Sequence, residues 1–184
     1  IRTPRGQEIR KAFIPRDKDH ILMAADYSQI ELRIIAALSK DPAMVNAFQK
    51  NKDIHATTAA RVFRVPPEEV TREQRGNAKT VNFGIIYGVS AFGLSQQTNL
   101  NRSESKELID NYYASYPELK QYIADQVNFA REHGYVATVL GRRRYLRDIN
   151  SQNAVVRGAA ERNAVNAPIQ GSAADIIKLA MIGI

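Results

Sequence analysis

The sequence predicts an α+β protein that is predominantly α-helical and has one small antiparallel β element. Two residue pairs with the spacing of a helix-starting capping box indicate helices, and several helix-like segments are bounded by proline or glycine. One alternating stretch, "YVATVLG" (135–141), is typical of a strand, and "RRRYLRDI" can return beside it as a hairpin. The hydrophobic share of 44% is ordinary for a folded protein.

The composition narrows the classes of partner. Among 184 residues, Lys plus Arg number 26 and Asp plus Glu 19, which gives a net charge of +7. Such a surplus favours a polyanionic partner, nucleic acid or an acidic membrane surface, over the alternative of a merely basic protein. The absence of cysteine excludes disulfides and thiolate metal sites, and fits a reducing cytosol. No apolar run reaches the roughly 18 residues of a membrane span.

The N-terminal part reads as irregular chain, then a strand, then a helix. Residues 1–20 are mixed and basic, and their prolines limit regular structure. The apolar run "HILMAAD" (20–26) ends in a carboxylate and predicts a buried strand. Ser28 is placed to cap a helix over 29–39, with Glu31 as its capping-box partner.

Further helices follow from their start and stop signals. Asp41-Pro42 opens one helix, and Asp53 opens another over 54–63, which "VPPEE" ends. The next predicted helix covers 72–87, where Thr71 and Gln74 form a capping box and Gly88 is the stop. Three more predicted helices cover 103–115, 117–133 and 152–184, and the last of them contains Pro168. The chain begins with Ile1 and stops within an apolar helix face, which is expected of an excised piece of a longer protein.

The predicted helix over 72–87 carries two cations and two aromatic residues at one interval. Arg75, Lys79, Phe83 and Tyr87 are each four residues apart, so they lie on one helix face. Cations bind phosphate oxygens and rings stack on bases, so this stripe could hold a nucleotide lengthwise. The alternative is an amphipathic helix with the rings in the core and the cations in water. Gly84 costs a helix about 1 kcal/mol against alanine, which indicates a close approach or a bend there.

Three other sets of residues carry possible chemistry. Asp26, at the end of the predicted strand, suits a divalent cation, although it could simply cap the next helix. The basic run "GRRRYLR" (141–147) favours contact with a phosphate backbone over a merely solvated turn. Arg162, Asn166 and Gln170 repeat the four-residue interval and could contact bases and sugars, or equally form a wet helix face.

Other chemistries find no support. The histidines, His20, His55 and His133, are scattered without the spacing of a zinc site. There is no glycine-rich phosphate loop followed by Lys and Ser or Thr, and no arrangement typical of a serine or cysteine nucleophile.

Taken in order, these motifs resemble the family A DNA polymerases of the bacterial DNA polymerase I type. "DYSQIELR" resembles the family's motif A, and "RGNAKTVNFGIIYG" its motif B, R-x3-K-x3-F-x3-Y-G. The resemblance continues through "DIHATTAARVF", "GRRRYLRDI" and "APIQGSAADIIKLAM" across the whole chain. It implies a right-hand polymerase fold, with a partial palm over 1–38 and the fingers over 39–184.

The resemblance also implies an activity: addition of deoxynucleotides to a primer 3′ end with two Mg²⁺ ions, in replication or repair. Asp26 and the carbonyl of Tyr27 match the metal ligands, and Glu31 matches the residue that excludes ribonucleotides by crowding the sugar 2′ position. Lys79 matches a catalytic proton donor to pyrophosphate. The other matched positions are the nucleotide ligands His55, Arg75, Lys79, Phe83 and Tyr87 and the primer or template contacts Arg144, Arg162, Asn166 and Gln170.

One departure from the family concerns the second catalytic aspartate, which lies in a His-Asp-Glu motif. No "HDE" occurs in the chain, so the isolated piece is expected to be inactive. Two alternatives remain: a non-catalytic, basic nucleic-acid-binding module, and a relative of the single-subunit RNA polymerases. The implied partners are primer-template DNA and deoxynucleoside triphosphates, with no membrane and no obligate protein partner, in the bacterial cytoplasm at the nucleoid.

Overall fold

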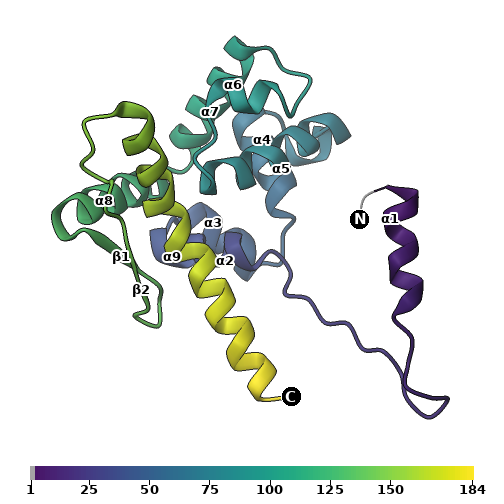
Figure 1. Cartoon of the computed structure of the whole chain (residues 1–184). Helices are drawn as coiled ribbons and strands as arrows, with labels where there is room; N and C mark the ends of the chain where they lie inside the picture. Colours follow the sequence, from purple (N-terminus) through teal and green to yellow (C-terminus); the bar gives the residue numbers. More distant parts are fainter. Residues whose placement is uncertain (1–2) are drawn as a thin grey trace.

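The computed structural model describes residues 3–184 as a helical body with a separate N-terminal arm (Figure 1). The arm holds a short helix, α1 (Pro4–Glu8), which continues into the 3₁₀ helix η1 (Ile9–Ala12). The prediction of irregular structure before residue 20 was therefore wrong for this stretch. Thr3 caps α1 by accepting a hydrogen bond from the backbone N–H of Gly6, and a proline is tolerated in a first turn.

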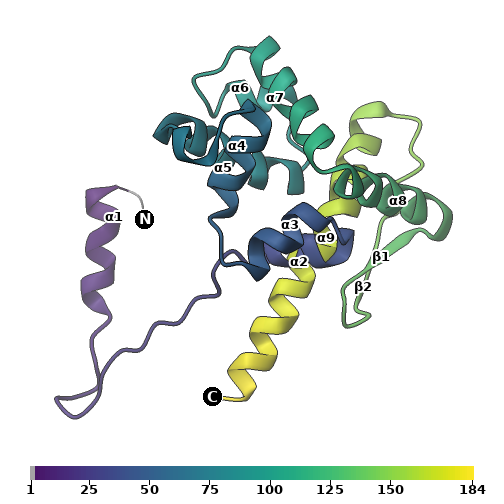
Figure 2. The ribbon, with the colours of Figure 1, turned by 180° about the vertical axis from the view of Figure 1, so that it is seen from behind.

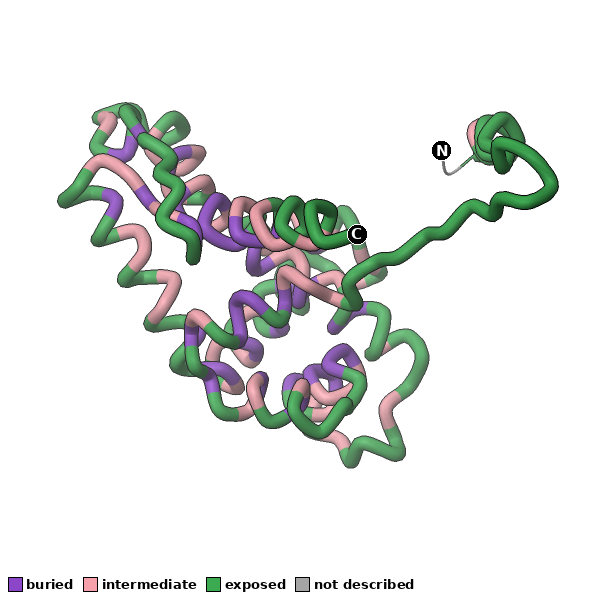
Figure 3. The backbone as a smooth tube through the Cα atoms, turned by 90° about the horizontal axis from the view of Figure 1, so that it is seen from below, coloured by how far each residue is buried: buried purple, intermediate pink, exposed green. Residues whose placement is uncertain are grey.

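Between the arm and the body the chain is extended, and the predicted buried strand over 20–26 is wrong. Ile21, Leu22 and Met23 are exposed at 88, 60 and 73% of their surfaces. Figure 3 shows this stretch leading away from the body with no neighbour on either side. An extended segment becomes a strand only when a second strand accepts and donates its backbone hydrogen bonds, and the two paired strands within residues 3–184 are both elsewhere.

The body begins with α2 (Ile30–Ser39), but not through the predicted capping box of Ser28 and Glu31, which was wrong. The residue before the helix is Gln29, which lies in the left-handed region at φ 56° and forms no side-chain cap. Ser28 contributes its backbone carbonyl instead, which accepts a hydrogen bond from Nε of Arg33 at 2.9 Å. The left-handed turn at Gln29 takes the Ser28 hydroxyl out of line with the first N–H groups.

The next three helices confirm the start signals read from the sequence. They are α3 (Pro42–Gln49), capped by Asp41, α4 (Ile54–Phe63), capped by Asp53, and α5 (Arg72–Ile86), where the capping box of Thr71 and Gln74 is complete. The short 3₁₀ helix η2 (Pro67–Glu69) separates the last two. Gly88 stops α5 as predicted, since its φ of 66° suits glycine best.

Two long helices follow a short one. The short helix α6 (Ala91–Ser95), capped by Ser90, was not predicted. The helices α7 (Arg102–Ser115) and α8 (Pro117–His133) break at Tyr116-Pro117 as predicted. A proline cannot continue the hydrogen-bond ladder of a preceding helix but is tolerated in the first turn of the next.

The hairpin and the last helix complete the body. Strand β1 (Tyr135–Ala137) pairs antiparallel with β2 (Arg143–Tyr145), with Val136 opposite Arg144. The hairpin is confirmed, although its strands are shorter than predicted. The helix α9 (Ala154–Ile182) runs through Pro168 to the end of the body (Figure 2). Within the described residues, no helix has the length and apolarity that crossing a bilayer requires.

Two hydrophobic clusters hold the body together. The larger joins α2 to α8 with the middle of α9, and its fully buried members include Leu32, Met44, Ile54, Val81, Leu94, Tyr112, Leu119 and Ile169. The smaller joins α8, β1 and α9, where Ala160, Ala164 and Ala167 let the two helices pack closely. The larger cluster fixes α4, α5 and α9 relative to one another, and these three helices carry most of the candidate site residues.

Candidate nucleotide and nucleic-acid interface

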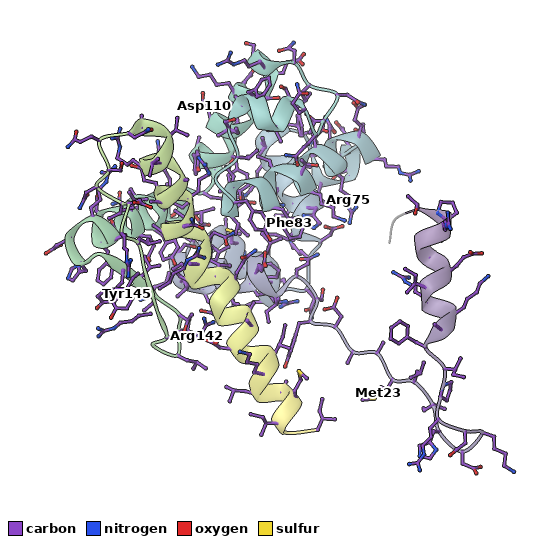
Figure 4. The ribbon with its side chains drawn as sticks, viewed as in Figure 1. Met23, Arg75, Phe83, Asp110, Arg142 and Tyr145 are labelled. Atoms are coloured by element: carbon purple, nitrogen blue, oxygen red, sulfur yellow. The ribbon has the colours of Figure 1, made fainter. Side chains whose placement is uncertain are left out.

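The stripe on α5 lies on one face, as its spacing predicted, but its members differ in burial. Arg75 and Lys79 are exposed, Phe83 is half-buried against the larger core cluster, and Tyr87 caps the helix with 43% of its surface exposed. Figure 4 shows Arg75 and Phe83 along α5. The alternative of an amphipathic helix with both rings in the core therefore fits Phe83 in part and does not fit Tyr87.

Gly84 has the close approach that its presence in a helix indicated. A Cβ atom placed on it would lie 2.6 Å from Cγ1 of Val89. The backbone N–H of Val89 also donates to the carbonyl of Gly84 at 2.8 Å. The chain therefore folds back tightly over Gly84 directly after Tyr87. A side chain at position 84 would displace the returning segment at Val89.

At the N-terminal end of the stripe, Arg75 is tied to the start of α4. Its Nε donates to Oδ2 of Asp53 at 2.7 Å. The other carboxylate oxygen of Asp53 accepts from the N–H groups of His55 and Ala56. Burial alone would raise the pKa of Asp53, but the hydrogen bond from Arg75 and those two N–H groups outweigh it and lower the pKa.

Replacing Asp53 with alanine is expected to reduce the free energy of unfolding by about 1 kcal/mol, the usual cost of losing an N-cap. Because folding lowers the pKa of this carboxyl, its contribution is present above its unfolded pKa and is lost as pH falls through the folded value. Urea unfolding at pH 7 and at pH 3 measures both. Asp110, exposed on α7, supplies the control Asp110→Ala, and an equal loss in both variants would contradict the capping role.

His55 and Phe83 lie together near the middle of the stripe. Their ring centroids are 5.8 Å apart, and only 3% of His55 is exposed. Burial lowers the pKa of His55, the charges of Arg75 and Lys79 lower it further, and Asp53 opposes them. The imidazole is therefore a neutral hydrogen-bonding group beside two cations and an aromatic face.

At the C-terminal end of the stripe, Tyr87 joins three helices. Its hydroxyl donates to Oε2 of Glu31 on α2 at 2.9 Å and accepts from Nε2 of Gln170 on α9 at 3.3 Å. Burial raises the pKa of Tyr87, and the Glu31 carboxylate raises it further, so the phenol keeps its proton. Two predicted nucleotide ligands and one predicted DNA contact are thereby brought into direct contact.

The other predicted DNA contacts on α9 lie near the same end. Arg162 is exposed, and its Cγ packs so closely on Gly88 that a Cβ on that glycine would lie 2.6 Å away. Asn166 is half-buried, and its Nδ2 is enclosed with no hydrogen-bond partner within residues 3–184. An enclosed amide without a partner is costly, and an added acceptor would reach this nitrogen only after its surroundings moved.

The basic hairpin is attached to α9 through Arg142. Its Nε donates to Asp175 at 2.9 Å and its Nη2 to the carbonyl of Gly171 at 3.1 Å. The hydrogen bonds that Asp175 accepts from Oγ1 of Thr138 and from Arg142 lower the pKa of this carboxyl. Arg144, the predicted DNA contact, is exposed and forms no ion pair within the described chain. One arginine thus anchors the hairpin and leaves Arg144 accessible.

The predicted metal ligands lie at the junction of the extended segment and the body. Asp26 and Tyr27 line a hollow of about 230 Å³ together with residues from the end of α9, among them Ile177 and Met181. An exposed carboxylate and a backbone carbonyl are oxygen ligands of the kind that Mg²⁺ takes, and Mg²⁺ often has only one or two protein carboxylates. No group of three His, Asp or Glu side chains gathers as a metal site within residues 3–184.

The sequence did not reveal that three residues, Asp53, Thr58 and Asn82, support the stripe on α5. Asp53 was read only as a helix start, and Thr58 and Asn82 were not singled out. Thr58 and Asn82 are fully buried and bond to each other at 3.1 Å across α4 and α5. The one available signal was the presence of polar residues at positions where the helix pattern calls for apolar ones.

Comparison with known proteins gives the family. The model of DNA polymerase family A matches residues 1–184. The chain belongs to this family. It is 53% identical over 182 residues to DNA polymerase I of Streptococcus pneumoniae serotype 4, which covers 98% of this chain and 21% of that protein. DNA polymerase I of Geobacillus stearothermophilus is also 53% identical, over 99% of this chain and 21% of its own length.

A solved structure agrees with the family assignment. The POL domain of Pol1 from M. smegmatis, in complex with DNA primer-template and dNTP, matches with a TM-score of 0.90 and 50% identity over 99% of this chain and 32% of that chain. The right-hand polymerase fold implied by the sequence is therefore confirmed. The chain spans about a fifth of the length of these curated relatives.

Proposed function

We propose that this chain forms part of a DNA-directed DNA polymerase that adds deoxynucleotides to a primer 3′ end. The observation that carries the proposal is the convergence of other residues on the stripe: Glu31 and Gln170 at one end, His55 near the middle and Asp53 at the other end. A surface with cations at one end and an exposed ring at the other suits a nucleoside triphosphate laid along α5.

Each residue has a distinct role in this proposal. Arg75 and Lys79 hold the triphosphate, with His55 as a further donor to a phosphate oxygen. Phe83 packs against the incoming nucleotide, and Tyr87 lies beside the templating base. The exposed Arg144 holds primer and template together with three residues of α9, Arg162, Asn166 and Gln170. This agrees with the primer-template and dNTP in the M. smegmatis complex. Lys79 gives a proton to the departing pyrophosphate.

Asp26 and the carbonyl of Tyr27 would hold magnesium. When bound, such ions stabilise the attacking and leaving oxygens of an in-line displacement. The chain's own contribution is to place the carboxylate on the side of α9 that faces the extended segment. We assign residues 1–38 to the palm and 39–184 to the fingers, although residue 38 lies within α2, so the two parts would be joined by a continuous helix. We place the polymerase in the bacterial cytoplasm, where its DNA lies.

Glu31 tests the sugar preference that separates a DNA polymerase from an RNA polymerase relative. In the complete polymerase, Glu31→Ala is expected to raise ribonucleotide incorporation relative to deoxynucleotide incorporation by about tenfold or more, or about 1.4 kcal/mol, since room opens beside the 2′ position. Primer extension with each nucleotide type measures the ratio. Tyr87→Phe is the control, because it removes the same hydrogen bond and leaves the bulk of Glu31.

An unchanged ratio in Glu31→Ala would contradict the assignment. The 184-residue chain alone should extend no primer, since it holds one of the two expected aspartates. DNA binding without nucleotide addition by the complete protein would instead favour the non-catalytic module.

A further inference from the structure

Four buried polar side chains form a continuous chain of hydrogen bonds beneath the stripe. Tyr116, at the junction of α7 and α8, lies 2.9 Å from Oγ1 of Thr58 on α4. Thr58 donates to Oδ1 of Asn82 on α5 at 3.1 Å, and Nδ2 of Asn82 lies 3.0 Å from Nδ1 of His55. All four are at most 3% exposed. The proposed function uses His55 and leaves the other three without a role.

The chemistry of these groups gives the chain one direction. A threonine hydroxyl has one proton, and that of Thr58 is directed at Asn82, so Tyr116 must donate at the Tyr116–Thr58 contact. An amide nitrogen only donates, so Nδ1 of His55 must accept from Asn82. A neutral imidazole that accepts at Nδ1 has its proton on Nε2.

The reverse direction leaves a buried donor without an acceptor. If Nδ1 of His55 held the proton, Asn82 would turn its oxygen to Nδ1 and its nitrogen to Thr58, and the Thr58 hydroxyl would donate to Tyr116. The hydroxyl proton of Tyr116 would then have no acceptor, because Thr58 is its one hydrogen-bond partner within residues 3–184. Tyr116 is fully buried, so water cannot replace the lost bond.

The other ring nitrogen of His55 keeps contact with solvent. Within the described chain, the enclosed side-chain atoms without a partner are Asp41 Oδ2, Ser105 Oγ and Asn166 Nδ2. Nε2 of His55 is not among them, and it forms no hydrogen bond to residues 3–184, so it is not enclosed. Burial and the charges of Arg75 and Lys79 keep the ring neutral by lowering its pKa.

We propose that Asn82, Thr58 and Tyr116 are positioning residues that hold the proton of His55 on Nε2, so that the ring donates a hydrogen bond to a phosphate oxygen of the incoming nucleotide. An Nε2 without a proton would present a lone pair to an anionic oxygen and repel it. The phosphate part of this inference rests on the proposed function, whereas the tautomer is a property of the chain without any ligand.

The tautomer can be measured directly. Long-range ¹H–¹⁵N NMR of the ¹⁵N-histidine-labelled 184-residue chain at pH 7, without nucleotide, distinguishes a protonated from an unprotonated ring nitrogen, and a His55→Gln variant assigns the signals. We expect Nε2 protonated and Nδ1 unprotonated. A protonated Nδ1 would overturn the inference, whatever the chain's enzymatic role.

A conservative double variant tests the far end of the chain. Tyr116→Phe alone keeps the direction, because the buried Thr58 hydroxyl would still need Asn82 as its acceptor. The double variant Thr58→Val/Tyr116→Phe removes both hydroxyls and frees the amide of Asn82 to turn, so a fraction of molecules with the proton of His55 on Nδ1 should appear. Tyr113→Phe is the matched control, because Tyr113 lies half-buried one turn earlier and its hydroxyl forms no hydrogen bond within residues 3–184. A spectrum of the double variant identical to that of the parent chain would overturn the role of Thr58 and Tyr116.

The phosphate part has a separate readout in the complete polymerase. In Thr58→Val/Tyr116→Phe the apparent dissociation constant for the incoming nucleotide should rise by the inverse of the fraction of molecules that keep the proton on Nε2. Primer-template affinity should stay constant. Mixed tautomers with an unchanged nucleotide affinity would overturn the phosphate contact and leave the hydrogen-bond chain in place.

Discussion

In the complete polymerase, Asp26→Ala is expected to reduce nucleotide incorporation by at least about 10³-fold. A carboxylate that holds a catalytic metal supports several kcal/mol of transition-state stabilisation, and each 1.36 kcal/mol changes the rate tenfold. Asp26 is exposed and makes no hydrogen bond or ion pair within residues 3–184, so the substitution removes no internal contact. Single-turnover extension of a labelled primer measures the effect.

Two measurements separate loss of chemistry from other causes. Primer-template affinity should be nearly unchanged in Asp26→Ala, because the predicted DNA contacts lie on α9 and the hairpin. Asp19→Ala removes a carboxylate from the same exposed segment and should keep full activity. Retention of more than a tenth of the activity by Asp26→Ala would contradict its role as a metal ligand.

Signals confined to a few residues predicted the helices well. Asp41, Asp53 and Thr71 cap their helices because the hydroxyl or carboxylate needs to reach only two or three residues along the chain. The strand over 20–26 failed for the opposite reason. Whether an apolar extended segment becomes a strand depends on a second strand, which no local pattern can supply.

In the candidate site, too, local features could be predicted from the sequence and contacts between distant residues could not. The four-residue interval correctly placed Arg75, Lys79, Phe83 and Tyr87 on one face of α5. It could not identify their partners, since Asp53 lies 22 residues from Arg75 and Glu31 lies 56 from Tyr87. These contacts depend on how the larger core cluster orients α2, α4 and α5.

Substitution of Lys79 is expected to have the second large effect on nucleotide incorporation. Lys79 is exposed on the stripe between Arg75 and Phe83, makes no ion pair within residues 3–184, and lies close enough to His55 for its charge to lower the pKa of that ring. A free ammonium beside a phosphate site can act both as a ligand and as a proton donor. Lys79→Ala in the complete polymerase is expected to slow single-turnover incorporation about 10²–10⁴-fold, the usual contribution of a general acid, and to weaken nucleotide binding.

The variant Lys79→Arg separates the two roles of this residue. A guanidinium keeps the positive charge but does not release its proton in proteins, so nucleotide affinity should recover while the rate stays low. Lys106→Ala, on the exposed face of α7, removes one positive charge far from the stripe and serves as the control. Full recovery of the rate in Lys79→Arg would reduce Lys79 to a charge that binds phosphate. An unchanged rate in Lys79→Ala would remove it from the chemistry altogether, and the stripe would then serve to grip the nucleotide without protonating its leaving group.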